Sequence, residues 1–76
     1  MAGGDYKTML KGYCMRHGLT MYRHKLDEVS YQLVIGQFKL ERYGPPEVAW
    51  ENLYRDMFYL IKRTHYEMGI TIFKDL

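Results

Sequence analysis

Residues 5–20 read Asp5-Tyr-Lys-Thr-Met-Leu-Lys-Gly-Tyr-Cys-Met-Arg-His-Gly-Leu-Thr20 and predict an amphipathic helix that leads directly into a strand. Four apolar residues recur at helical spacing and therefore share one face: Met9, Leu10, Tyr13 and Cys14. Asp5 is the candidate N-cap, because its carboxylate can accept hydrogen bonds from the first free backbone N–H groups. Gly18 can adopt the left-handed conformation that ends a helix, so we expect a helix over residues 6–17.

The rest of the chain predicts three short strands and a longer helix. Strands are expected over residues 20–26, 29–35 and 38–43, joined by a tight polar turn at Asp27-Glu28 and a hairpin at Gly36-Gln37. In the second strand, alternate residues fall on one face: Val29, Tyr31, Leu33 and Ile35. Gly44-Pro45-Pro46 then opens a helix over residues 46–66. This α-β-β-β-α order predicts an α+β domain with two helices packed on one face of a three-stranded antiparallel sheet.

Composition limits the class of protein. The chain has 76 residues, 47% of them hydrophobic, which suits one domain with a small core. Cys14 is the only cysteine, so no intramolecular disulfide can form, and we expect an intracellular protein. No apolar run approaches the length of a membrane span and no secretory signal is visible, so no membrane partner is expected. The net charge of +2 neither requires nor excludes a nucleic-acid partner.

The second helix carries more apolar surface than one stripe. Its main core face is expected to hold Ala49, Leu53, Met57, Leu60 and Ile61. A second row, about 100° around the helix, holds three aromatic residues: Trp50, Tyr54 and Phe58. A two-layer domain needs to bury only one face of such a helix. The aromatic row is therefore either covered by the tail through Ile70, Ile72 and Phe73, or exposed as a partner site.

Several of these residues also follow the pattern of a known family. In the first helix the match runs through Leu10, Tyr13-Cys14 and Arg16-His17-Gly18-Leu19. In the strands it includes Tyr22, Val29, Tyr31, Leu33, Ile35 and Gly36, and in the second helix it includes Ala49 and residues 52–56 and 59–62. With these residues the chain resembles the double-stranded-RNA-binding domain family over about residues 5–62. The resemblance implies a divergent family domain over residues 5–66, followed by a tail at 67–76.

The resemblance implies a reader of duplex RNA that uses three surface patches. In the first patch, on the first helix, many members have a glutamate where this chain has Gly12. The second patch is a loop of several residues, which here is reduced to Asp27-Glu28. The third patch is a lysine-rich helix start, whereas residues 46–50 hold no cation and include Glu47. We therefore expect the fold to be kept and the usual RNA surface to be lost.

For a family member without its basic patch, the resemblance implies a non-enzymatic protein–protein interaction module in an RNA-processing or RNA-silencing assembly. The partner is another protein or a second copy of the chain, and the candidate contact residues are Trp50, Tyr54 and Phe58. The third strand, if it lies at an open edge, offers a second route by strand pairing. The alternative is direct binding of double-stranded RNA through scattered cations: Lys7, Lys11, Arg16, Arg23, Lys25, Lys39 and Arg42, with Lys62 and Arg63.

A catalytic or metal-binding role has less support. Cys14-x-x-His17 has half of a zinc spacing, with His24 and His65 as further ligands, but a structural zinc site needs four. Cys14 also lies on the predicted core face, where a free cysteine acts as a small hydrophobe. No catalytic triad, phosphate loop or carboxylate pair stands out, so we expect no enzyme activity, metal or cofactor. An unrelated α+β domain, such as a phage-encoded inhibitor, can have the same element order and stays an alternative.

Overall fold

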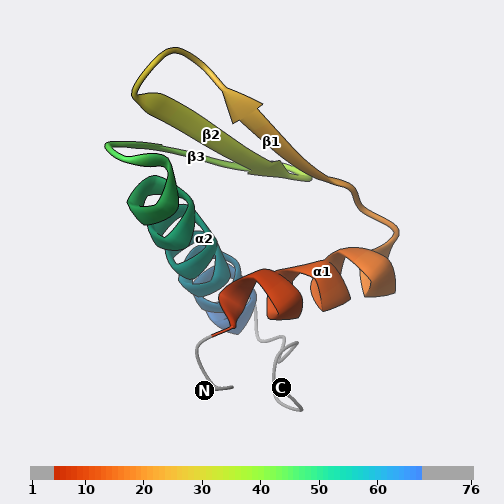
Figure 1. Cartoon of the computed structure of the whole chain (residues 1–76). Coiled ribbons are helices and arrows are strands. Elements are labelled where there is room, and N and C mark those ends of the chain that lie inside the picture. Colours follow the sequence, from red (N-terminus) through yellow and green to blue (C-terminus); the bar gives the residue numbers. More distant parts are fainter. Residues whose placement is uncertain (1–4, 68–76) are drawn as a thin grey trace.

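An antiparallel sheet with two helices on one face makes up residues 5–67, the part of the chain that the computed structural model describes (Figure 1). The elements are α1 (Tyr6–His17), β1 (Met21–Lys25), β2 (Ser30–Ile35), β3 (Phe38–Tyr43) and α2 (Pro46–Glu67). The strand order is β1-β2-β3, with each neighbouring pair antiparallel. The predicted fold class is therefore confirmed. The expected packing of Ile70, Ile72 and Phe73 on the second helix lies outside the described residues.

Both ends of α1 are capped as the sequence predicts. Asp5 Oδ1 accepts a hydrogen bond from the backbone N–H of Thr8 at 3.1 Å, and Oδ2 accepts one from the Thr8 hydroxyl at 2.6 Å. At the other end, Gly18 has a φ of 65° and donates its backbone N–H to the carbonyl of Cys14. These caps satisfy backbone groups that a helix end leaves free, and they fix α1 at its expected bounds.

The loop between β1 and β2 is longer than the predicted turn at Asp27-Glu28. It spans residues 26–29 and is closed by a hydrogen bond from the Leu26 N–H to the Ser30 carbonyl at 2.9 Å. Asp27 Oδ1 accepts the N–H of Val29 at 2.9 Å, so this side chain shapes the loop. The prediction that the second strand begins at Val29 is wrong by one residue, because β2 begins at Ser30 and Val29 lies in the loop, where it is 55% exposed.

The core lies between α2 and the inner face of the sheet. Four residues of the predicted core face of α2 are fully buried, namely Ala49, Leu53, Met57 and Ile61. Leu60, which was predicted with them, is only half-buried. They pack with alternate residues of β2 and with three residues of α1: Tyr31, Leu33, Ile35, Leu10, Tyr13 and Cys14. Each large apolar side chain removed from water stabilises the fold by about 1.5–3 kcal/mol.

Beyond the half-buried Met21, the inner face of β1 stays open to solvent. Arg23 pairs with Leu33 in β2 and therefore faces the same side of the sheet as that buried residue. Arg23 and Lys25 are nevertheless exposed, because α2 lies against β2 and β3 rather than β1. The open side of β1 therefore presents cationic side chains next to the helical layer.

Candidate interaction surfaces

Two of the predicted RNA-binding cations meet at one aromatic ring. Arg23 Nη1 donates to the Tyr54 hydroxyl at 3.3 Å, and Lys7 Nζ lies 5.9 Å from the centre of the Tyr54 ring. A cation over a ring face is attracted by the π electrons. The contacts bring side chains of α1, β1 and α2 together into a small cationic site beside the open face of β1.

The other predicted RNA-binding residues do not join this site. Lys39 in β3 alternates with the inward-facing Leu40 and so lies on the outer face of the sheet. Arg42 is ion-paired with Asp56 of α2, with Nη2 2.9 Å from Oδ2. Three more cations are exposed on α1 and β1: Lys11, Arg16 and Lys25. The cations therefore point in several directions and do not form one stripe that could follow a phosphate backbone.

The predicted aromatic row on α2 divides into a buried and a half-buried part. Phe58 is 7% exposed, because Tyr6 of α1 lies over it with ring centres 5.3 Å apart. Trp50 and Tyr54 are half-buried, and the Trp50 ring centre lies 5.4 Å from that of Tyr31 and 5.9 Å from that of Tyr54. Thus α1 and β2 cover most of the row. Phe58 offers no surface to a partner, whereas part of Trp50 and Tyr54 stays accessible.

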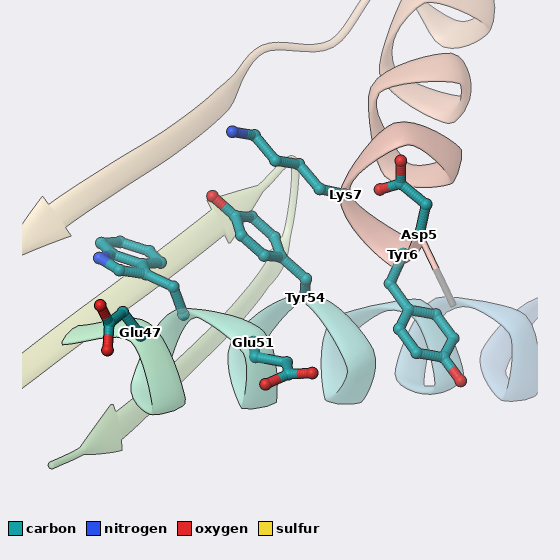
Figure 2. Close-up of a pocket in the computed structure, with 7 residues that line it drawn as sticks. Asp5, Tyr6, Lys7, Glu47, Glu51 and Tyr54 are labelled. Atoms are coloured by element: carbon teal, nitrogen blue, oxygen red, sulfur yellow. The ribbon is translucent and has the colours of Figure 1, made fainter. Parts of the chain in front are cut away.

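A pocket of about 280 Å³ lies between the start of α1 and the first turns of α2 (Figure 2). Its lining includes three carboxylates, those of Asp5, Glu47 and Glu51, and one cation, Lys7, which Figure 2 shows extending past Tyr54. Hydrogen bonds from Thr8, first from its hydroxyl, hold the pKa of Asp5 below its usual value. Three carboxylates and one cation give the lining a net negative formal charge, which disfavours phosphate at the start of α2. Lys7 and Tyr54 also belong to the cationic site, so these acidic groups lie next to it.

Exposed apolar side chains occur both in the β1–β2 loop and at the start of α2. The Gly44 N–H donates to the Val29 carbonyl at 2.9 Å and ties these two segments together. The two segments carry four exposed apolar residues that we call the apolar end: Leu26, Val29, Tyr43 and Val48. Asp27, Glu28 and Glu47 neighbour them in the chain, and residues 26–29 and 43–48 include no Lys or Arg. The apolar end therefore combines exposed apolar side chains with neighbouring acidic residues.

Sequence reasoning missed the apolar end, because it placed Val29 in the second strand, on the face of Tyr31, Leu33 and Ile35. The signal that could have revealed the longer loop is Asp27, a residue type that often accepts the backbone N–H two residues further on. The Val29 N–H is also the main reason that the pKa of Asp27 is lowered, followed by the Ser30 hydroxyl. An Asp in this role indicates that the residue whose N–H it accepts still belongs to the loop, and it therefore predicts a later start for the next strand.

The residues considered as zinc ligands do not converge. Cys14 is buried in the core, and burial raises the pKa of its thiol. His17 and His65 both contact Tyr13, whose hydroxyl lies 3.2 Å from His65 Nε2 and whose ring centre lies 4.6 Å from that of His17. His24 instead stacks on Tyr22 in β1. Within residues 5–67, no three His, Cys, Asp or Glu side chains are close enough together to hold a metal ion.

Charged side chains recur along α2, the longer of the two helices. Over the described residues, neither helix has the combination of length and apolar character needed to cross a membrane. Comparison of the chain with protein-family models, with curated proteins and with solved structures finds no match.

Proposed function

We propose that this chain is a non-enzymatic, divergent module of the double-stranded-RNA-binding type that acts through protein–protein contacts in an RNA-processing assembly. The proposal rests on one observation: the apolar end occupies the loop and helix start where the family places two of its RNA-binding patches. Leu26, Val29, Tyr43 and Val48 are exposed there, and the charges beside them are acidic.

Physical chemistry favours a protein over a duplex at the apolar end. Binding to a duplex gains much of its free energy from cations that displace the counterions of phosphates, and the segments that form the apolar end have none. Exposed apolar groups gain free energy when they leave water, at about 25 cal/mol per Å². A partner that matches this surface is a protein face with apolar side chains at its centre and Lys or Arg at its rim.

Direct binding of double-stranded RNA is the second candidate function. It is favoured by the convergence of Lys7 and Arg23 on Tyr54, with Lys25 exposed on the same strand. A gel-shift series with duplex RNA tests it directly. Binding that weakens steeply with salt and that fails in the double variant Lys7→Ala, Arg23→Ala would support this candidate.

The leading proposal is tested with a matched pair of helix-surface variants. Val48→Glu places a charge in the apolar end, and Met15→Glu places the same charge on an exposed position of α1. Affinity capture is combined with light scattering, so that a protein partner and a second copy of the chain are both detected. We expect the partner or the dimer to be lost with Val48→Glu and kept with Met15→Glu. A strictly monomeric chain that retains no protein, or equal retention by both variants, contradicts the proposal.

A further inference from the structure

A groove runs between β3 and α2 on the side away from β2. It has a volume of about 300 Å³ and is lined by Leu40, Arg42, Asp56, Tyr59, Leu60 and Arg63. Leu40 and Leu60 are half-buried and give it an apolar centre. Arg42 and Asp56 neutralise each other through their ion pair. Arg63 is left as the cation of the groove, since its contact with Glu67 at 3.3 Å joins two side chains that are 78% and 63% exposed.

The strand beside this groove has an unpaired edge in the described sheet. β3 pairs only with β2, and a two-residue hairpin at Gly36-Gln37, as the sequence predicts, joins Ile35 to Phe38. Hydrogen-bonded pairs alternate with non-bonded pairs along an antiparallel ladder that starts at such a hairpin. The backbone N–H and C=O groups of Lys39, Glu41 and Tyr43 therefore face away from β2. Arg42 Nη1 donates to one of them, the Glu41 carbonyl, at 2.6 Å, and an incoming strand has to displace that contact. With it displaced, these groups form a template on which another strand can pair.

We propose that β3 and the groove together bind an extended segment of a partner protein. In this segment an aliphatic and an acidic residue are two positions apart, so that their side chains lie on the same face of the added strand. A strand added beside β3 places every second side chain on the inner face, over the groove. An aliphatic side chain there covers Leu40 and Leu60. An acidic one meets the guanidinium of Arg63, which can exchange its exposed, weakly held contact with Glu67 for the new carboxylate.

The lining of the groove shares no residue with the apolar end, although the free edge of β3 reaches Tyr43. Its cation belongs to the last turns of α2, whereas Val48 lies in the first turn of the same helix. A test of the groove therefore leaves the test with Val48→Glu intact, and failure of either proposal is recognised separately.

The probe is a short fluorescein-labelled peptide in which threonines alternate with leucine and glutamate, compared with a peptide that has lysine in place of glutamate. Fluorescence anisotropy measures binding to the whole chain. We expect saturable binding of the glutamate peptide and about fivefold weaker binding of the lysine peptide. Arg63→Glu should reverse this preference, whereas Lys11→Glu, the same change of charge on an exposed position of α1, should leave it unchanged.

Strand pairing is tested separately from charge. Glu41→Pro removes an N–H that faces the free edge and should abolish binding, since proline is tolerated in an edge strand but donates no hydrogen bond. Because this variant can also disturb folding, a glutamate peptide with N-methylated backbone amides provides the same test on the unchanged chain. The proposal is overturned if the peptide does not saturate, if N-methylation has no effect, or if Arg63→Glu and Lys11→Glu weaken binding equally.

Discussion

Arg42 of β3 contacts a single carboxylate oxygen of Asp56 in α2 through two nitrogens, with Nη2 2.9 Å and Nε 3.0 Å from Oδ2. The other oxygen, Oδ1, lies 3.2 Å from Nε of Arg55. The Arg42–Asp56 ion pair joins β3 to α2 next to the groove that we propose as a peptide site. It also engages one of the cations that the sequence offered for RNA binding.

Asp56→Asn should lower the free energy of unfolding by no more than about 1 kcal/mol, because both partners of the ion pair are partly exposed to water. Urea denaturation followed by circular dichroism measures the change. A double-mutant cycle with Arg42→Ala isolates the pair from other effects of each substitution. A coupling free energy of several kcal/mol would show that the pair holds the fold and is not a surface contact.

Two glycines of the first helical segment should respond in opposite directions to alanine. Gly18→Ala forces a side chain into a φ of 65° and should destabilise the domain by about 1 kcal/mol. Gly12→Ala, inside α1, meets no atom within 4 Å and should stabilise it by about 0.5–1 kcal/mol. Thermal melts of the two variants beside the wild type check both signs. Equal shifts in the same direction would contradict the assigned caps.

The fold could be predicted because its element boundaries carry local signals. Asp5 and Gly18 bound α1, Gly36 sits at the β2–β3 hairpin, and Pro46 begins α2, as each residue type predicts. Val29 was placed wrongly because its alternation with Tyr31, Leu33 and Ile35 extends the strand pattern by one residue, whereas β2 begins at Ser30 and Val29 belongs to the loop. That start depends on Asp27, a loop-forming residue type whose hydrogen bond from the Val29 N–H the strand pattern alone did not indicate.

The candidate surfaces were harder to predict because they depend on contacts between distant segments. The periodicity of α2 places Trp50, Tyr54 and Phe58 in one row, but it contains no information about which of them α1 covers. Tyr6, near the start of the chain, buries Phe58 and leaves Tyr54 half-buried beside Lys7. The number of Lys and Arg residues in the sequence likewise does not indicate which of them form ion pairs within the fold, as Arg42 does with Asp56.

The buried and the half-buried residues of the aromatic row should differ in how much they contribute to the free energy of unfolding. Phe58→Ala empties a buried site and should cost about 3–5 kcal/mol, whereas Trp50→Ala at a half-buried site should cost roughly half of that. Urea denaturation followed by circular dichroism measures both, since Trp50 is the only tryptophan and its fluorescence is lost in one variant. A smaller loss for Phe58→Ala than for Trp50→Ala would mean that Tyr6 does not cover Phe58 in solution.

Acid should weaken the domain partly through Asp5 and Asp27, whose pKa values are lowered by hydrogen bonds from Thr8 and from the Val29 N–H. A carboxyl with a lowered folded-state pKa stabilises the fold above its unfolded pKa of about 3.9, and this contribution is lost as the pH falls through the folded pKa. The variant Asp5→Asn, Asp27→Asn keeps an acceptor oxygen at each site but removes both titrations. Its urea midpoint should fall less steeply than that of the wild type below about pH 4. Parallel midpoint curves would mean that neither carboxylate is held by these bonds.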